Sequence, residues 1–212
     1  LKDASKAGEE LLSVGGHRQF TLEAWVKPSK PSGPSAKYTI FSKLNEFSFF
    51  LNANMQPSFM REVVPAGTGQ AIAFATPAGD TVPVGFWTHV AATYDGEKMK
   101  LYINGSLATT YGKAENSNTA IPEIPVGKES ENSFLLVGAE RVAGKYTANF
   151  EGELDETRMW DSPRTADLLL QYANRSISAD PATSKLPPSL VAYHTFDEGK
   201  AVAISPDTTG AS

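Results

Sequence analysis

The chain has 212 residues, a formal net charge of -5 and no cysteine. The acidic balance argues against a nucleic-acid-binding surface, which needs a basic stripe. The absence of cysteine excludes thiol catalysis, disulfides and cysteine zinc sites. No apolar run approaches the roughly 18 residues that a membrane helix needs, and the length lies near the upper range of a single all-β domain.

The first half of the chain consists of short segments in which apolar and polar residues alternate. Phe20, Leu22, Ala24 and Val26 occupy every second position of the first clear example. A period of two is the pattern of a β-strand with one buried face, and loops rich in Pro, Ser and Gly separate the segments. Strands are therefore predicted at residues 11–14, 20–26, 38–43, 46–51, 55–60 and 70–76.

Residues 87–111 (WTHVAATYDGEKMKLYINGSLATTY) carry the most regular pattern in the chain. Two dipeptides, Asp95-Gly96 and Asn104-Gly105, interrupt three alternating runs. Such dipeptides supply the positive-φ residues that two-residue hairpin turns need. The stretch therefore predicts three consecutive antiparallel strands.

The second half of the chain contains longer polar segments between fewer strands. We predict a polar insertion at 111–131, strands at 134–138 and 149–160, a polar loop at 139–148, and a final strand at 190–196. A connector rich in Pro precedes the final strand.

One helix is predicted, at about 165–174. Ser162 as N-cap and Pro163 in the first turn fit its start. The expected inner stripe of this helix is Leu168, Leu169 and Tyr172.

The overall pattern is about a dozen short strands with frequent turns and a single helix, which indicates an all-β fold. We predict an antiparallel two-sheet β-sandwich with one short helix near the C-terminus, as one domain over residues 1–212. Because the chain begins at Leu1 without Met, we expect it to be cut from a larger exported protein, with residues 190–212 leading to a further domain.

Three segments resemble the laminin-G-like, concanavalin A-like jelly rolls: FTLEAWVKP at 20–28, WTHVAATYDGEKMKLYINGSL at 87–107, and FEGELDETRMWDSPRTADLL at 150–169. The pentraxins are similar in the same places, notably at 152–161. The resemblance implies a two-sheet jelly roll in extracellular or cell-surface proteins. It also implies a glycan- or protein-binding module, or an accessory module beside a catalytic domain, that often holds one structural Ca²⁺.

The same late strand tests the hypothesis of glycoside hydrolysis. Glu153-Leu154-Asp155 resembles the start of the E-x-D-x-x-E signature of laminarinase-like hydrolases, but Arg158 stands at the last position. Retaining hydrolysis needs two carboxyl groups about 5–5.5 Å apart, and an arginine cannot replace one of them. We therefore predict that the chain is not an enzyme and that these charged residues make structural hydrogen bonds and ion pairs.

The three histidines of the chain, His17, His89 and His194, lie in no metalloprotease or nucleophile-elbow context. His89 and His194 fall inside predicted strands. We interpret both as packed or hydrogen-bonded structural residues.

Calcium is the cofactor that the resemblance favours, because Ca²⁺ binds hard oxygens that include backbone carbonyls. In similar folds an Asp of the late strand binds the ion, and that position is Asp155 here. Asp3 is the second expected ligand, since Leu1-Lys2-Asp3 loosely resembles the entry segment of the family.

A glycan-binding surface needs exposed aromatic side chains beside amides and carboxylates. The chain has three tryptophans, Trp25, Trp87 and Trp160, which occupy core-forming positions of the family, and we expect them to pack the two sheets. The residues expected to bind ligand lie at a rim and are Tyr111, Lys128, Glu129, Asn132 and Tyr146.

The sequence thus predicts a non-catalytic extracellular binding or adhesion module that recognises carbohydrate or glycoprotein, with Ca²⁺ as a structural ion. The alternative is an accessory domain that braces or spaces a neighbouring catalytic domain of the glycoside hydrolase or sialidase type. A divergent glycoside hydrolase is the more distant alternative. We expect other domains of a larger protein as partners, and neither nucleic acid nor membrane insertion.

Overall fold

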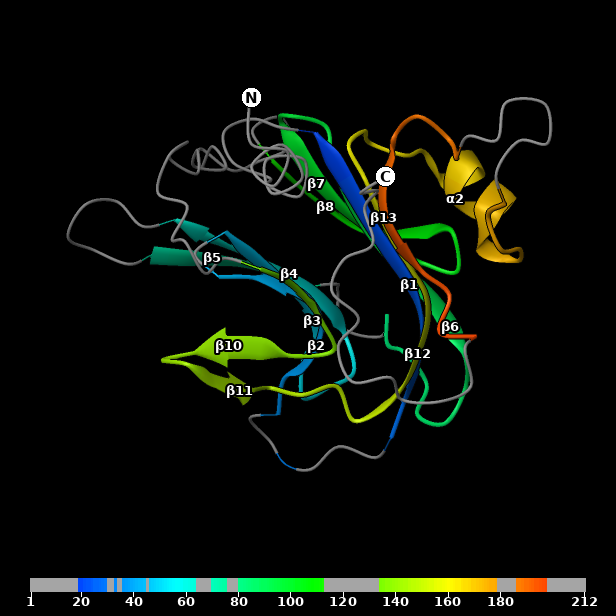
Figure 1. The fold of residues 1–212 in the computed structure, drawn as a ribbon. Coiled ribbons are helices and arrows are strands. Elements are labelled where there is room, and N and C mark those ends of the chain that lie inside the picture. The colour runs from blue at the N-terminus through cyan, green and yellow to red at the C-terminus, as the bar shows by residue number, and fades with distance from the viewer. Residues whose placement is uncertain are drawn as a thin grey trace, which may run out of the picture.

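The computed structural model describes residues 19–29, 33, 36–44, 46–63, 70–75, 80–112, 134–178 and 186–197. These residues form two antiparallel sheets, a small hairpin and one helix (Figure 1). The elements are β1 (Phe20–Pro28), β2 (Tyr38–Lys43), β3 (Phe47–Leu51), β4 (Pro57–Val63), β5 (Gln70–Ala75), β6 (Thr88–Tyr94), β7 (Lys98–Ile103), β8 (Ser106–Gly112), β9 (Leu135–Val137), β10 (Glu140–Val142), β11 (Lys145–Thr147), β12 (Gly152–Trp160), α2 (Ala166–Ala173) and β13 (Leu190–His194).

The two large sheets pack face to face. One has six strands in the order β13-β12-β1-β6-β7-β8, and the other has five in the order β5-β4-β3-β2-β9. Figure 1 shows α2 on the outer side of the six-stranded sheet and the β10–β11 hairpin beside the five-stranded sheet. The predicted all-β sandwich with one short helix is confirmed.

The main core lies between the sheets and follows the period of two along β1. Phe20, Leu22, Ala24 and Val26 all point into it and are almost completely buried. The ring of Phe20 lies 5.7 Å from that of Phe59 on the opposite sheet. Aromatic pairs at this separation add to the stabilisation from area burial, so the two sheets are joined at this point by ring contacts as well as by aliphatic packing.

The predicted meander is present as β6, β7 and β8. Asn104 and Gly105 have φ values of 49° and 75°, as a turn with two left-handed residues requires. The side chain of Asn104 also accepts a hydrogen bond from the backbone N–H of His89 at 3.0 Å. The Asn-Gly dipeptide is therefore both the turn and a brace between neighbouring strands.

The helix begins one turn later than its predicted cap. Thr165 is the N-cap, and its hydroxyl accepts from the N–H of Leu168 at 3.4 Å; Ser162 as the cap is wrong. Of the expected inner stripe, Leu169 is fully buried whereas Leu168 is 38% exposed. With eight residues, this helix of the described chain is too short to cross a membrane.

Two further expectations are wrong. Residues 139–148 were expected as a polar loop, but they form the β10–β11 hairpin around a turn at Ala143 and Gly144, with φ values of 48° and 79°. Three-residue strands are too short for a visible period of two. Trp25 and Trp160 do not pack between the sheets, because they lie on the outer face of the six-stranded sheet.

The other predicted strands are present, with ends that move by a few residues. The predicted strand at 11–14 and most of the polar insertion, from residue 113, lie outside the described residues. The prediction of one domain over residues 1–212 stays a prediction.

Gly152 has a backbone conformation and a close backbone neighbour that both disfavour a side chain. Its φ is +143°, and a Cβ there would lie 2.3 Å from the backbone oxygen of Lys27. We expect Gly152→Ala to lower the free energy of unfolding by about 3 kcal/mol, because strain and a backbone clash combine. Gly144→Ala is the matched control, since its φ is +79° with nothing within 4 Å, and should cost about 1 kcal/mol. Equal losses in urea unfolding would contradict the assigned clash.

Candidate functional site

The outer face of the six-stranded sheet carries the polar residues of β1. Thr21, Glu23, Trp25 and Lys27 alternate with the core residues and point away from them. Helix α2 covers part of this face, where Leu169 packs on Ala91 and Tyr102 in a second apolar cluster. Most of β1 is therefore buried on both sides, although its outer residues are polar.

A buried carboxylate lies at the centre of this covered region. Glu23 has no exposed surface; it accepts a hydrogen bond from the indole N–H of Trp160 at 2.7 Å, and its other oxygen lies 3.1 Å from Nε2 of His89. The guanidinium of Arg158 lies 3.6 Å away. Burial acts to raise the pKa of Glu23, but His89, Arg158 and Trp160 outweigh burial and lower it. The structural role expected for His89 is thereby explained.

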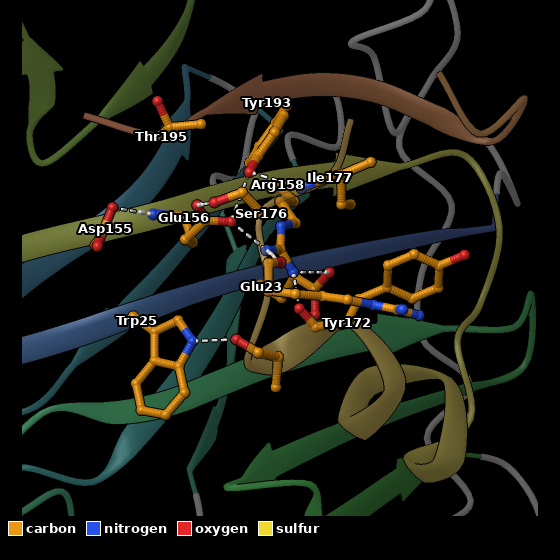
Figure 2. Close-up of polar contacts among 12 residues, drawn as sticks. Glu23, Trp25, Asp155, Glu156, Arg158, Tyr172, Ser176, Ile177, Tyr193 and Thr195 are labelled. Atoms are coloured by element: carbon orange, nitrogen blue, oxygen red, sulfur yellow. Dashed lines mark hydrogen bonds and ion pairs between the residues drawn. The ribbon is translucent and has the colours of Figure 1, made fainter. Parts of the chain in front are cut away.

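Arg158 connects this carboxylate to the end of the helix. Its guanidinium donates to the carbonyl oxygens of Tyr172 and Arg175 at 2.9 and 2.8 Å and pairs with Glu156 (Figure 2). The same Glu156 accepts hydrogen bonds from the hydroxyls of Tyr193 and Ser176. The residue that breaks the hydrolase signature is thus a structural connector between β12, β13 and α2.

A β-bulge in β12 decides which acidic residues face outward. Glu156 has φ +49°, and the pairing with β1 shifts between Glu23 and Trp25. An extra residue in a strand reverses the alternation beyond it. Asp155 therefore lies opposite Trp25 on the outer face, while Leu154 returns to the core.

Asp155, the expected calcium ligand, lies apart from the group formed by Arg158, Ser176 and Tyr193 in Figure 2. Its Oδ1 accepts a hydrogen bond from the N–H of Glu156 at 2.8 Å. Burial raises the pKa of Asp155, and the nearby carboxylates of Glu156 and Asp197 raise it further. Asp197 is a neighbour that no sequence pattern indicated, and Asp3 lies outside the described residues.

The described residues around Asp155 supply only some of the oxygens that a calcium ion needs. A carboxyl group whose pKa is raised by neighbouring carboxylates would be stabilised by a cation. However, within the described ranges no three His, Cys, Asp or Glu side chains gather to hold a metal ion. Asp155 and Asp197 would therefore need backbone carbonyls or other oxygens to complete the shell of six to eight ligands.

The predicted rim residues are only partly within the described chain. Tyr146, on β11, is 58% exposed, whereas Tyr111, on β8, is partly buried and packs against the main core. Lys128, Glu129 and Asn132 lie outside the described residues. The structure leaves Tyr146 accessible and makes Tyr111 mainly a packing residue.

An exposed aromatic surface lies elsewhere, and sequence reasoning missed it. Phe86 is 69% exposed and Trp87 is 42% exposed. The ammonium of Lys27 lies 5.9 Å from the centre of the Trp87 ring and 2.7 Å from Oε1 of Glu153. We call these four residues, Lys27, Phe86, Trp87 and Glu153, the Trp87 surface. The expectation that Trp87 packs between the sheets is wrong, because Trp87 is 42% exposed and belongs to no core cluster of the described residues.

The loop that carries the aromatic pair is anchored at two points. Val82 is buried in the main core, and its N–H donates to the carbonyl of Met55 at 2.8 Å. Gly85 donates to the carbonyl of Pro28 at 2.8 Å, at the end of β1. The two exposed rings therefore project from a backbone that is held in place.

Comparison with known proteins agrees with this architecture. Residues 3–168 match a laminin G family described as the concanavalin A-like lectin/glucanases superfamily. The chain belongs to this superfamily. Over 81 residues, 38% of the chain, it is 32% identical to mouse Pappalysin-1, and this match spans 4% of that protein's length.

Two solved structures show the same superfamily fold. One is a Bacteroides ovatus protein described provisionally as carbohydrate-binding, with 19% identity, 88% of this chain and 47% of that chain covered, and a TM-score of 0.58. The other is the CBM40 of the Ruminococcus gnavus IT-sialidase, with 14% identity, coverage of 81% and 88%, and a TM-score of 0.55. At these identities the likeness concerns the fold.

The buried network around Glu23 should determine how the free energy of unfolding changes at acidic pH. A carboxyl group whose pKa is lowered by folding stabilises the native state above its ordinary pKa, and this contribution is lost as the pH falls. For Glu23 the ordinary value is 4.5. We therefore expect Glu23→Gln to cost about 3 kcal/mol at pH 7 and to lose less stability than the wild type between pH 5 and 3.

Glu153→Gln is the control for this measurement, because the pair of Glu153 with Lys27 is solvent-exposed. It should change the free energy of unfolding by less than about 1 kcal/mol. Denaturant titrations at several pH values measure both variants. If the free energy of unfolding of Glu23→Gln fell with pH as steeply as that of the wild type, the buried carboxylate would not be the source of the pH dependence.

Proposed function

We propose that this chain is a non-catalytic carbohydrate-binding module that acts in an extracellular or cell-surface setting, as one part of a larger protein. The observation that carries the proposal is the Trp87 surface, where an exposed indole lies beside a solvent-exposed ion pair. The fold of carbohydrate-binding neighbours supports the same function.

The chemistry of the Trp87 surface suits a sugar. A pyranose ring has an apolar face of C–H groups, which packs on an aromatic ring, and a rim of hydroxyl groups, which need hydrogen-bond partners. Trp87 offers the ring, while Lys27 and Glu153 offer a donor and an acceptor. Because the loop is anchored at Val82 and Gly85, little conformational freedom is lost when a ligand binds.

The state of the acidic residues supports a binding function over catalysis. Glu153 is paired with Lys27, and Glu156 is paired with Arg158 and hydrogen-bonded by Tyr193. A glycosidase needs one neutral carboxylic acid and one free carboxylate on the same sugar. The pKa of Glu156 is lowered, since these partners outweigh its burial, which is the opposite of what a general acid requires.

A specific observation also favours the second candidate, an accessory domain that braces a neighbour. Val84 and Phe86 are 40% and 69% exposed, although both are apolar. Exposed apolar clusters mark protein contacts as well as ligand sites. The two functions differ at Lys27 and Glu153, because an ion pair assists sugar recognition and is not needed for packing against another domain.

The rim predicted from the sequence is the alternative position for the same function. It comprises Tyr111, Lys128, Glu129, Asn132 and Tyr146, and Tyr146 is its most exposed described member. A comparison of Trp87 and Tyr146 therefore distinguishes the two surfaces.

Replacement of Trp87 by alanine should abolish most glycan binding. We expect Trp87→Ala to weaken binding at least tenfold, the equivalent of about 1.4 kcal/mol, because the stacking surface is removed. The measurement is a glycan array followed by calorimetry on each glycan that binds. Tyr146→Ala is the matched control and should bind within twofold of the wild type. A loss confined to Tyr146→Ala would move the site to the predicted rim.

Calcium is the second part of the proposal, with Asp155 as a ligand and Asp3 as the residue that the family resemblance adds. The raised pKa of Asp155, beside Glu156 and Asp197, supports it. A cation bound there would hold the bulge of β12 and remove repulsion between carboxylates.

Thermal melts with millimolar Ca²⁺ and with excess chelator test this part. The wild type should melt at a higher temperature with Ca²⁺, since an ion that binds only the native state stabilises it. Asp155→Asn keeps the oxygen that caps Glu156 but removes the charge, so it should melt above the wild type in chelator and show no response to Ca²⁺. A full response in Asp155→Asn would overturn the assignment of this ligand.

A further inference from the structure

Three residues of the Trp87 surface, Glu153, Lys27 and Trp87, follow one another at one end of the six-stranded sheet. Glu153 of β12 pairs with Lys27 of β1, and Val26, the residue before Lys27, pairs with Thr88, the residue after Trp87. Trp87 lies just before the start of β6, and the ammonium of Lys27 is 5.9 Å from the centre of its ring, so Lys27 lies between Glu153 and Trp87. Neighbouring strands are about 4.8 Å apart, so the acid and the base lie at the spacing of paired strands, and the aromatic ring lies beside the base.

We propose that this row binds a neutral pyranose through two adjacent hydroxyl groups, which deepens the proposed function and rests on it. The sugar stacks on Trp87, the ammonium of Lys27 donates to one hydroxyl oxygen, and the carboxylate of Glu153 accepts from the next hydroxyl. The ligand class is a hexopyranoside with a vicinal diol that carries no carboxylate of its own.

The geometry of the ion pair supports a diol as the recognised group. The Nζ of Lys27 and Oε1 of Glu153 are 2.7 Å apart, which is close to the separation of two adjacent equatorial hydroxyl oxygens. Both side chains remain accessible, with 34% and 60% of their surface exposed. Each keeps further hydrogen-bonding capacity, since an ammonium has three donors and a carboxylate about four acceptor positions.

The charge of the row argues for a neutral sugar over an acidic one. The single cation, Lys27, is already neutralised by Glu153, and Glu153 is the more exposed of the two. An acidic sugar would bring its carboxylate next to this glutamate and be repelled. Binding of a neutral sugar adds no charge and should therefore depend little on salt.

The row differs from its neighbour further along the same strands. There, Asp155, Trp25 and His89 lie side by side, but the indole N–H of Trp25 donates to the carbonyl of Ala173 in α2 at 2.6 Å, and His89 is 2% exposed. In that second row the indole is held by the helix and His89 is buried. The Glu153–Lys27–Trp87 row is the one that leaves its aromatic and polar groups accessible to a ligand.

The test begins with cellobiose, lactose and 3′-sialyllactose, titrated by NMR against the isotope-labelled chain. We expect a neutral disaccharide to shift the signals of Trp87 and its neighbours and to bind at least fivefold more tightly than 3′-sialyllactose. Monodeoxy analogues of the terminal sugar should then identify two adjacent hydroxyls whose removal weakens binding about tenfold each.

Variants then test the two charged groups separately. Lys27→Met and Glu153→Gln should each weaken binding about tenfold while the melting temperature stays within a few degrees, because surface ion pairs contribute little to stability. Lys145→Met, on exposed β11, is the matched control for loss of a cation and should bind like the wild type.

The outcomes separate this inference from the function on which it rests. Glycan binding that is lost in Trp87→Ala but unchanged in Lys27→Met and Glu153→Gln overturns the diol assignment and leaves the function intact. Tighter binding of 3′-sialyllactose, improved further by Glu153→Gln, overturns the neutral ligand class. Failure of all glycans on a broad array overturns both proposals.

Discussion

The burial of one carboxylate on the outer face of a sheet is the constraint on which the rest of this structure depends. Glu23 lies in the middle of β1 with no exposed surface, and an uncompensated charge there would cost several kcal/mol. Trp160, His89 and Arg158 surround it. Arg158 in turn binds carbonyls at the end of α2, so the helix, three strands and the carboxylate form one connected unit.

The bulge in β12 follows from this connected unit. Glu156 must reach Arg158, Ser176 and Tyr193 from the outer face, and Asp155 must share that face opposite Trp25. Two successive residues of a regular strand point to opposite faces, so a bulge is required. Its cost is a left-handed non-glycine residue and a carboxyl group, Asp155, with a raised pKa.

The sequence predicted the sheets well because their inner faces follow a period of two. The meander was predicted by alternation and by the Asn104-Gly105 turn, and both are present. The role of the tryptophans was not predictable in the same way. Alternation tells which residues share a face but not what covers that face, and a helix over the outer face makes polar positions as buried as apolar ones.

The candidate site was missed for a related physical reason. The family resemblance assigns Trp87 to a core-forming position, directly before the strand β6. Its accessibility depends on where Val82 and Gly85 anchor the loop, which local sequence does not encode. The position of Asp155 was correctly placed on the late strand, whereas the proximity of Asp197 arises from the pairing of β12 with β13, a contact between segments far apart in the chain.

The short length of α2 explains why the Trp87 surface stays exposed beside the buried network around Glu23. A helix of eight residues is about 12 Å long, whereas β1, with nine residues, extends about 30 Å. The helix can close the rows at Glu23 and Trp25 and leaves the row at Lys27 to solvent. There the sheet still fixes the spacing of the side chains, because strand pairing continues to Gly152 and Pro28. The same register that holds the buried network together thus fixes Glu153 beside Lys27, and the anchored loop places Trp87 next to them. Rigid presentation of few groups is what a small binding surface requires.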